Sequence, residues 1–245
     1  MRVKQLHPWR VTPAEARKIQ QQLQQQVIME DVFDGIRTVA GVDIGIKRDS
    51  DKGEIAKAAV VILNYPELEL IDQIRIEQPI EFPYIPGLLS FRESPAIITA
   101  FEKLSTEPDL IIVDGQGIAH PRRFGIASHL GLLLDKPTIG CAKSRLYGRH
   151  NQPDMTAGSY AYLYDKDDII GAVVRTRENV NFVYVSIGHK ISLQSAIQYT
   201  LKCCRDYRLP QPTRLAHQVA GGMMLMKPKE VKSVKKEGPR QLSLF

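Results

Sequence analysis

Three carboxylates occupy positions from which a folded sheet can bring them together. Asp43 interrupts the otherwise apolar segment VAGVDIGI, and an ionised carboxylate there is costly unless it is paired or bound to a metal. Asp114 ends the apolar segment DLIIVD, and carboxylates at the carboxyl ends of strands point into the crevice where α/β proteins bind ligands. Glu93 lies in the segment SFRE, near the start of a predicted helix. Three such oxygen ligands suit Mg²⁺ or Mn²⁺, and such clusters serve phosphodiester hydrolysis.

Each of these residues also has a simpler interpretation. Asp43 could be an edge-strand residue that faces water, and Asp114 begins an Asp-Gly pair of the kind found in turns. Glu93 stands three residues after Ser90, which fits a helix-capping box, and a capping glutamate is not free to hold a metal. The segment VDIG also resembles the phosphate turn of actin-like sugar kinases. That alternative needs a second glycine-rich phosphate loop, which we do not find in the sequence.

The elements that must position these residues follow from apolar periodicity and turn signals. Thr12 and Glu15 fit a capping box ahead of a helix whose apolar face is spaced by four residues. Strands come first and then alternate with helices, which predicts an α/β fold with a mixed central sheet and helices on both faces. We predict a helix over residues 12–29, strands over 38–46, 58–63 and 68–77, a helix over 90–104, a strand over 110–113, a helix over 125–134, a strand over 138–141, a hairpin of 169–176 with 181–187, and a helix over 193–205.

Composition limits the class of protein. The chain has 245 residues and three cysteines without a metal-ligand spacing, which favours a reducing, cytoplasmic location. No apolar run approaches the roughly 18 residues that span a bilayer, so we expect no membrane partner. The net charge is +6, but six basic and two acidic residues fall in 227–240, which leaves +2 for residues 1–226. We therefore predict one domain over 1–226 and a disordered basic tail over 227–245.

Several segments, in order and spacing, resemble the endonuclease V family, and the pair PYIPG and SFRE is the most specific of them. The resemblance implies a ribonuclease H-like fold and an endonuclease that recognises inosine in DNA or RNA. It implies cleavage 3′ of the lesion with 5′-phosphate and 3′-hydroxyl ends, and Mg²⁺, with Mn²⁺ as a substitute, held by Asp43, Glu93 and Asp114. The segments are VAGVDIG (39–45), PYIPGLLSFRE (83–93), VDGQGIAHPRRFGIASHLGLLLD (113–135), PTIGCAKSRLYG (137–148) and IGHKISL (187–193).

The same resemblance implies further site residues. Lys143 would stabilise charge on the scissile phosphate, and His217 would be a fourth metal ligand or a proton shuttle. Two prolines would stiffen a wedge whose tyrosine fills the gap left by an extruded base. The residues expected at the lesion or the nucleic acid are Pro83, Tyr84, Ile85, Pro86, Gly115, His120, Arg122 and Arg123.

One position departs from the family pattern. Gln116 stands in DGQG, where family members have histidine, and an amide neither titrates nor readily binds a metal. Changed activity or metal preference would follow if that histidine takes part in the chemistry, and a non-catalytic inosine-binding protein is the corresponding alternative. The sequence leaves His189 open as either a catalytic or a structural residue.

The chain ends in the peptide QLSLF, which resembles the short motif by which bacterial proteins dock into the replication sliding clamp. A charged linker that presents apolar anchors would tether the enzyme near DNA. The alternatives are a chance match or an apolar end that folds back on the domain. The expected anchors are Gln241, Leu242, Leu244 and Phe245.

Overall fold

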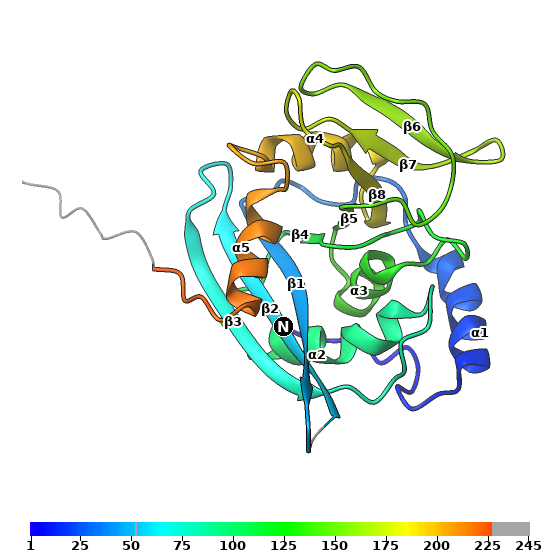
Figure 1. The fold of residues 1–245 in the computed structure, drawn as a ribbon, viewed down its shortest axis with the longest axis vertical. Coiled ribbons are helices and arrows are strands. Elements are labelled where there is room, and N and C mark those ends of the chain that lie inside the picture. Colours follow the sequence, from blue (N-terminus) through cyan, green and yellow to red (C-terminus); the bar gives the residue numbers. More distant parts are fainter. Residues whose placement is uncertain (52, 227–245) are drawn as a thin grey trace, which may run out of the picture.

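The computed structural model describes residues 1–51 and 53–226, in which eight strands form a single mixed sheet (Figure 1). Its strand order is β3-β2-β1-β4-β5-β8-β7-β6. The predicted tail, including Gln241, Leu242, Leu244 and Phe245, lies outside the described residues. The strands are β1 (Thr38–Asp49), β2 (Gly53–Asn64), β3 (Leu70–Pro79), β4 (Leu110–Val113), β5 (Thr138–Ala142), β6 (Tyr160–Asp165), β7 (Asp168–Val174) and β8 (Val183–His189).

Three parallel strands form the middle of the sheet. The first residues of β1, Val39–Val42, pair with the whole of β4, and β4 pairs in turn with β5. Every other neighbour is antiparallel. Because β1 is longer than β4, its second half continues past the end of β4, with β2 beside it. The carboxyl ends of β4 and β5 therefore open beside the middle of β1.

Helices cover both faces of the sheet, as predicted. Successive side chains of a strand point to opposite faces, so Val39 of β1 packs with α4 and α5, whereas Ala40 packs with α2 and α3. Figure 1 shows α5 beside β1 and α4 beside β8, with α2 and α3 in a separate group. None of these helices is long and apolar enough to cross a membrane, within the described part of the chain. The helices are α1 (Pro13–Leu23), α2 (Leu89–Lys103), α3 (Ile126–Leu134), α4 (Leu193–Cys203) and α5 (Gln211–Ala220), with a 3₁₀ turn at Gln24–Gln26.

The first helix begins as predicted and ends early. Thr12 and Glu15 form the predicted capping box. The helix stops at Leu23 rather than continuing to residue 29, and the reason is tertiary. The Ile28 N–H donates to Nδ1 of His189 and the Ile28 carbonyl accepts from the Lys190 N–H. These bonds hold the following segment in an extended conformation beside the end of β8.

Two elements were missed by the sequence prediction. Strand β6 has the sequence YAYLYD, whose alternation was visible, and it pairs with β7 across a tight turn at Lys166. Helix α5 follows directly after Pro210 and contains Pro212 at its start. Prolines so close together indicated a loop, although proline fits the first turn of a helix well.

Candidate active site

The carboxylates of Asp43 and Asp114 meet at the carboxyl end of β4. The Asp114 N–H donates to the carbonyl of Val42 at 3.2 Å, so the two aspartates follow paired positions on neighbouring parallel strands. Lys143 directly follows β5, the next parallel strand. These three residues line a cleft of about 510 Å³, together with Glu93 and His217. The predicted convergence of chain segments is therefore present in the fold.

Glu93 enters this cleft from α2 and does not cap the N-terminus of that helix. The helix begins at Leu89 with Leu88 as N-cap, and no side chain caps it among the described residues. Ser90 is inside the helix and buried, so the capping interpretation is wrong. Glu93 is 8% exposed, and burial, with further contributions from Asp43 and Asp114, raises its pKa to about 8.

Asp43 faces α5, the helix that the sequence prediction missed. Nδ1 of His217 lies 3.0 Å from a carboxylate oxygen of Asp43, whose side chain is 9% exposed against 68% for the histidine. Burial and the nearby charge of Asp114 raise the pKa of Asp43, while His217 and Lys143 oppose that rise. An exposed histidine thus stands between a buried acid and solvent, where it can contact both.

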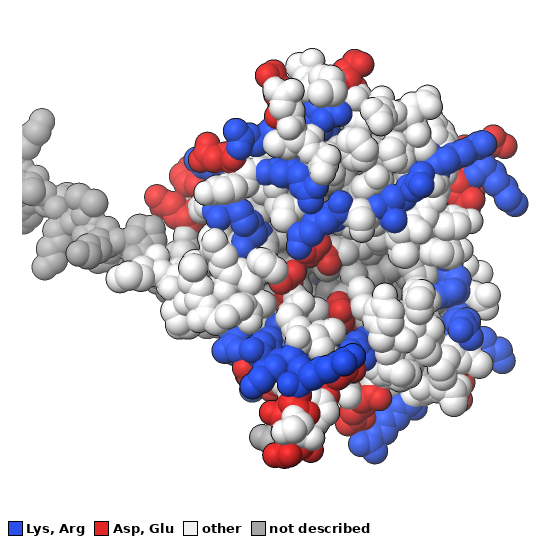
Figure 2. All heavy atoms as spheres, in the orientation of Figure 1, with Lys and Arg blue, Asp and Glu red and all other residues white. Residues whose placement is uncertain are grey.

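Lys143 pairs with the carboxylate of Asp114. The lysine is 40% exposed and the aspartate 17% exposed, so the pair lies at the mouth of the cleft. Lys143 and His217 therefore each contact one of the acidic side chains of the cleft. Figure 2 shows acidic side chains in the central hollow of this face, with lysines and arginines above and below them.

The acidic cluster fits a hard divalent cation. Within residues 1–51 and 53–226, no three Asp, Glu, His or Cys side chains are already grouped closely enough to hold an ion. However, Glu93 is buried and Asp43 is largely buried. Burial and the charge of Asp114 raise the pKa of Asp43, and burial and the charges of Asp43 and Asp114 raise the pKa of Glu93. Carboxylate oxygens that repel one another in this way are the donor set that Mg²⁺ and Mn²⁺ favour.

The PYIPG segment lines another part of the cleft. Tyr84 is 69% exposed, whereas the neighbouring Ile85 packs into an apolar cluster with Phe82 and Phe91. Gly87 has a φ of +79°, a backbone conformation that favours glycine. Tyr84, Ile85 and Pro86 all line the cleft, and Pro83 lies on the outer side of the segment. A segment fixed at its base thus presents one free aromatic ring.

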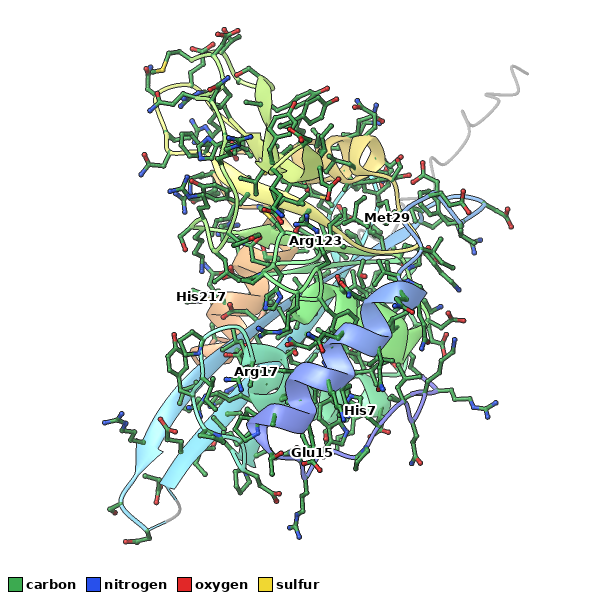
Figure 3. The ribbon with its side chains drawn as sticks, turned by 90° about the vertical axis from the view of Figure 1, so that its right-hand side faces the viewer. His7, Glu15, Arg17, Met29, Arg123 and His217 are labelled. Atoms are coloured by element: carbon green, nitrogen blue, oxygen red, sulfur yellow. The ribbon has the colours of Figure 1, made fainter. Side chains whose placement is uncertain are left out.

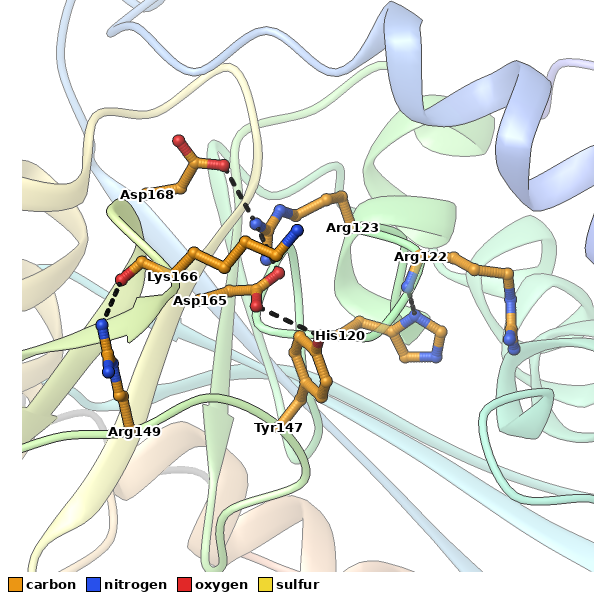
Figure 4. Close-up of polar contacts among 8 residues, drawn as sticks. All are labelled: His120, Arg122, Arg123, Tyr147, Arg149, Asp165, Lys166 and Asp168. Atoms are coloured by element: carbon orange, nitrogen blue, oxygen red, sulfur yellow. Dashed lines mark hydrogen bonds and ion pairs between the residues drawn. The ribbon is translucent and has the colours of Figure 1, made fainter.

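The residues that follow Asp114 contact the protein itself. His120 is buried, and its Nε2 lies 3.0 Å from the Gly87 carbonyl. Arg122 donates to the same carbonyl at 2.6 Å. Figure 4 shows Arg123 turned the other way, toward Asp165 and Asp168 on the β6–β7 turn, at 2.8 Å and 3.2 Å. Of these three residues, the structure brings His120 to the cleft lining and gives the two guanidinium groups protein partners.

Gly115 and Gln116 complete the floor of the cleft. A Cβ at Gly115 would lie 2.5 Å from a methyl group of Ile126, so a side chain does not fit there. Nε2 of Gln116 donates to the Ser144 carbonyl at 3.0 Å, which ties the loop after β4 to the loop after β5. The glutamine therefore has a positioning role in the loop that carries Asp114.

His189 lies at the far end of the sheet. It pairs with Thr138, at the start of β5, and its Nδ1 accepts from the Ile28 N–H. The position opposite the cleft identifies it as a structural histidine.

Sequence reasoning missed Gln20, which also lines the cleft. It lies on α1, to which the sequence gave no chemical role. Figure 3 shows α1, labelled at Glu15 and Arg17, in front of the other elements, with His217 at the left of the same view. Gln20 is 1% exposed, on the same helix face as Ala16 and Leu23. A polar residue on the buried face of a helix was the available signal.

Comparison with known proteins identifies the family. A sequence model described as endonuclease V matches residues 21–218. Endonuclease V of Trichormus variabilis is 53% identical over 221 residues, which cover 90% of this chain and 99% of the relative. The crystal structure of endonuclease V from Bacillus subtilis superposes with a TM-score of 0.86 at 31% identity and covers 90% of this chain and 96% of that chain.

A solved complex is also similar. Endonuclease V from Ciona intestinalis, bound to a DNA that contains an inosine followed by a ribo-adenosine, has a TM-score of 0.72 at 26% identity, over 85% of this chain and 95% of that chain. These neighbours confirm the predicted ribonuclease H-like fold. Their family consists of nucleases that generally need a divalent metal and act on nucleic acid. The chain is an endonuclease and belongs to the endonuclease V family.

Proposed function

We propose that this enzyme recognises deaminated bases, chiefly inosine, in DNA or RNA and hydrolyses the phosphodiester bond 3′ of the lesion. The observation that carries the proposal is that Asp43, Glu93 and Asp114 line the same cleft as the exposed side chain of Tyr84. An acidic floor suits a metal-assisted reaction at phosphate, and a projecting aromatic side chain suits a base that leaves its stack. The inosine-containing DNA in the related Ciona complex supports the same substrate class.

Asp43, Glu93 and Asp114 would hold Mg²⁺, for which Mn²⁺ can substitute, and His217 would be a fourth ligand or a proton carrier. When bound, the metal supplies an activated water and stabilises charge on the phosphate. The ε-ammonium of Lys143, at the mouth of the cleft, adds a positive charge where the scissile phosphate would lie. The reaction leaves a 5′-phosphate and a 3′-hydroxyl.

The PYIPG segment would act on the base rather than on the phosphate. Ile85 fixes the segment to the apolar cluster, and Pro83 and Pro86 restrict its backbone. Tyr84 can then fill the gap that the extruded base leaves in the duplex. Gly115, in the lining of the same cleft, would lie close to the extruded base. Arg122 and Arg123 would contribute long-range positive charge toward the sugar-phosphate backbone while keeping their protein partners.

The decisive experiment uses an end-labelled oligonucleotide that contains one inosine, incubated with the protein and Mg²⁺. A single nick 3′ of the inosine is expected, and it should be absent with EDTA and with the Asp43→Ala variant. Binding to the inosine duplex without cleavage, in Mg²⁺ or Mn²⁺ and on DNA or RNA, would instead support a non-catalytic binding protein with Gln116 as the cause.

We also propose that residues Gln241–Phe245, outside the described part of the chain, bind the bacterial replication sliding clamp. The charged segment before them would serve as a tether. Immobilised sliding clamp is expected to retain the full-length protein and not to retain a chain truncated at Arg240. Equal retention of the two would contradict this proposal. A cytoplasmic location, which three free cysteines support, is consistent with either result.

A further inference from the structure

The carbonyl of Gly87, at the end of the PYIPG segment, accepts hydrogen bonds from three side chains. Gln20 Nε2 donates at 3.1 Å, His120 Nε2 at 3.0 Å and Arg122 Nη2 at 2.6 Å. These donors come from α1 and from the loop that follows Asp114. Two chain regions far apart in the sequence therefore meet at one backbone atom.

Each donor is also held in place by a second bond. Nδ1 of His120 accepts from the Arg122 N–H at 3.1 Å, so the proton of the neutral ring lies on Nε2, toward Gly87. Burial, together with the charge of Arg122, lowers the pKa of His120 to about 4, which keeps the ring neutral. A histidine with both nitrogens engaged in this way is a hydrogen-bonding residue rather than a free base.

Gln20 connects the Gly87 end of the PYIPG segment to the loop that follows Asp114. Its Oε1 accepts from Nε of Arg122 at 2.6 Å, while its Nε2 donates to the carbonyls of both Gly87 and Phe124. Its side chain is buried, and a buried amide with both ends bonded is costly to replace by an apolar group. The family sequence model begins at residue 21, so this glutamine lies outside the matched segment.

The other end of the segment is held by a buried arginine. Arg92 Nη1 donates to the Phe82 carbonyl at 2.9 Å, and its Nη2 pairs with Glu54 at 2.8 Å. Between Phe82 and Gly87 the tyrosine ring is mostly exposed. The position of the ring is thus set by the two fixed ends of the segment and not by contacts of its own.

We propose that Gln20, His120 and Arg122 form a clamp on Gly87 that positions Tyr84 for base extrusion from a duplex. The inference rests on the proposed function, because it assigns the clamp to the base-extruding step of that reaction. The tyrosine ring enters a stacked duplex only at a cost of a few kcal/mol of unstacking free energy. A loosely held segment would be displaced instead of separating the bases. A single strand lacks that opposition, and its cleavage depends less on the clamp.

The first measurement tests the clamp without any reaction. Gln20→Met keeps the volume of the side chain and removes its hydrogen bonds, and Gln21→Met is the matched control at the exposed neighbouring position of the same helix. Hydrogen exchange of the amides in 83–88 is expected to be faster in Gln20→Met and unchanged in Gln21→Met. Unchanged exchange in Gln20→Met, with the protein folded by circular dichroism, would overturn the clamp itself.

The second measurement tests its role under single-turnover conditions on two substrates, an inosine-containing duplex and the same strand alone. Gln20→Met is expected to slow cleavage of the duplex about tenfold and of the single strand less than about twofold. In a double-mutant cycle, Gln20→Met is expected to cost little more once Tyr84→Ala has removed the ring. Equal losses on both substrates, or full additivity with Tyr84→Ala, would overturn the positioning role. If the wild-type protein cleaves neither substrate, the proposed function is wrong. The hydrogen-exchange measurement still tests whether Gln20 holds the Gly87 end of the segment.

Discussion

The two ends of β4 carry aspartates with opposite surroundings. Asp109 precedes the strand, and one of its oxygens accepts from the Arg37 N–H at 2.9 Å, the Thr38 N–H at 2.9 Å and the Thr38 hydroxyl at 3.0 Å. Asp114 follows the strand, five positions after Asp109, and lies with Asp43 in the acidic cleft. The first carboxylate completes the hydrogen bonding of neighbouring backbone, whereas the second contributes to a concentration of like charge.

The same difference extends across the two ends of the sheet. At the amino end of β5, Asp135 pairs with Lys4 at 3.1 Å and Lys190 at 2.7 Å. Burial opposes ionisation there, yet the two lysines hold the pKa of Asp135 below its ordinary value. At the carboxyl end, burial and mutual repulsion raise the pKa of both Asp43 and Glu93. Acids whose pKa is lowered by paired charges stabilise a fold, whereas acids whose pKa is raised by burial and by one another indicate a functional site.

The sharpest test of this comparison is Asp114→Asn. Removal of one carboxylate from the acidic cluster is expected to slow inosine-dependent cleavage by about a thousandfold or more. The free energy of unfolding, measured in urea without divalent metal, is expected to fall by no more than about 0.5 kcal/mol, because the exposed pair with Lys143 contributes little. A large loss of stability would show that Asp114 is a structural residue like Asp109.

Lys143→Ala is expected to have the next largest effect. Loss of a positive charge beside the scissile phosphate should reduce the cleavage rate about a hundredfold. Lys136→Ala, which breaks an ion pair with Glu107 at the far end of β5, is the matched control and should leave cleavage unchanged. Rates for the two variants that agree within about twofold would remove Lys143 from the reaction.

Asp109→Ala should give the converse result. The change leaves two backbone N–H groups and a hydroxyl without their acceptor, which is expected to lower the free energy of unfolding by about 1–3 kcal/mol. Cleavage measured well below the unfolding temperature is expected to stay within about twofold of the wild-type rate. A loss of cleavage without a loss of stability would contradict the structural role that we assign to Asp109.

The pH dependence of stability provides the last test. Burial, assisted by the charge of Lys190, lowers the pKa of His189 from 6.5 to about 4. Between these values the unfolded chain binds a proton that the folded chain does not, so stability is lost as the pH falls through that window. Urea unfolding of the wild-type protein should lose about 2 kcal/mol more than His189→Gln between pH 7 and pH 5. Parallel curves for the two proteins would show that His189 is not responsible.

Several features could be predicted from sequence because they depend on local pattern. The apolar run before Asp114 indicated a buried strand, and the capping box at Thr12 indicated a helix start. The alternation of strands and helices indicated the mixed sheet. Glu93 shows the limit of such patterns. Its spacing from Ser90 is that of a capping box, but the helix begins one residue before Ser90 and turns the glutamate into the cleft.

The sequence by itself determined which residue types the site could contain: three carboxylates, a lysine after a strand, and a tyrosine between prolines. Only the tertiary structure decided their partners. His217 reaches Asp43 because α5 packs on β1, although 174 positions separate the two residues. Gln20 reaches Gly87 across 67 positions for a similar reason. Local propensity acts over one or two helical turns, whereas such contacts are fixed by the packing of whole elements around the shared core, which no short segment encodes.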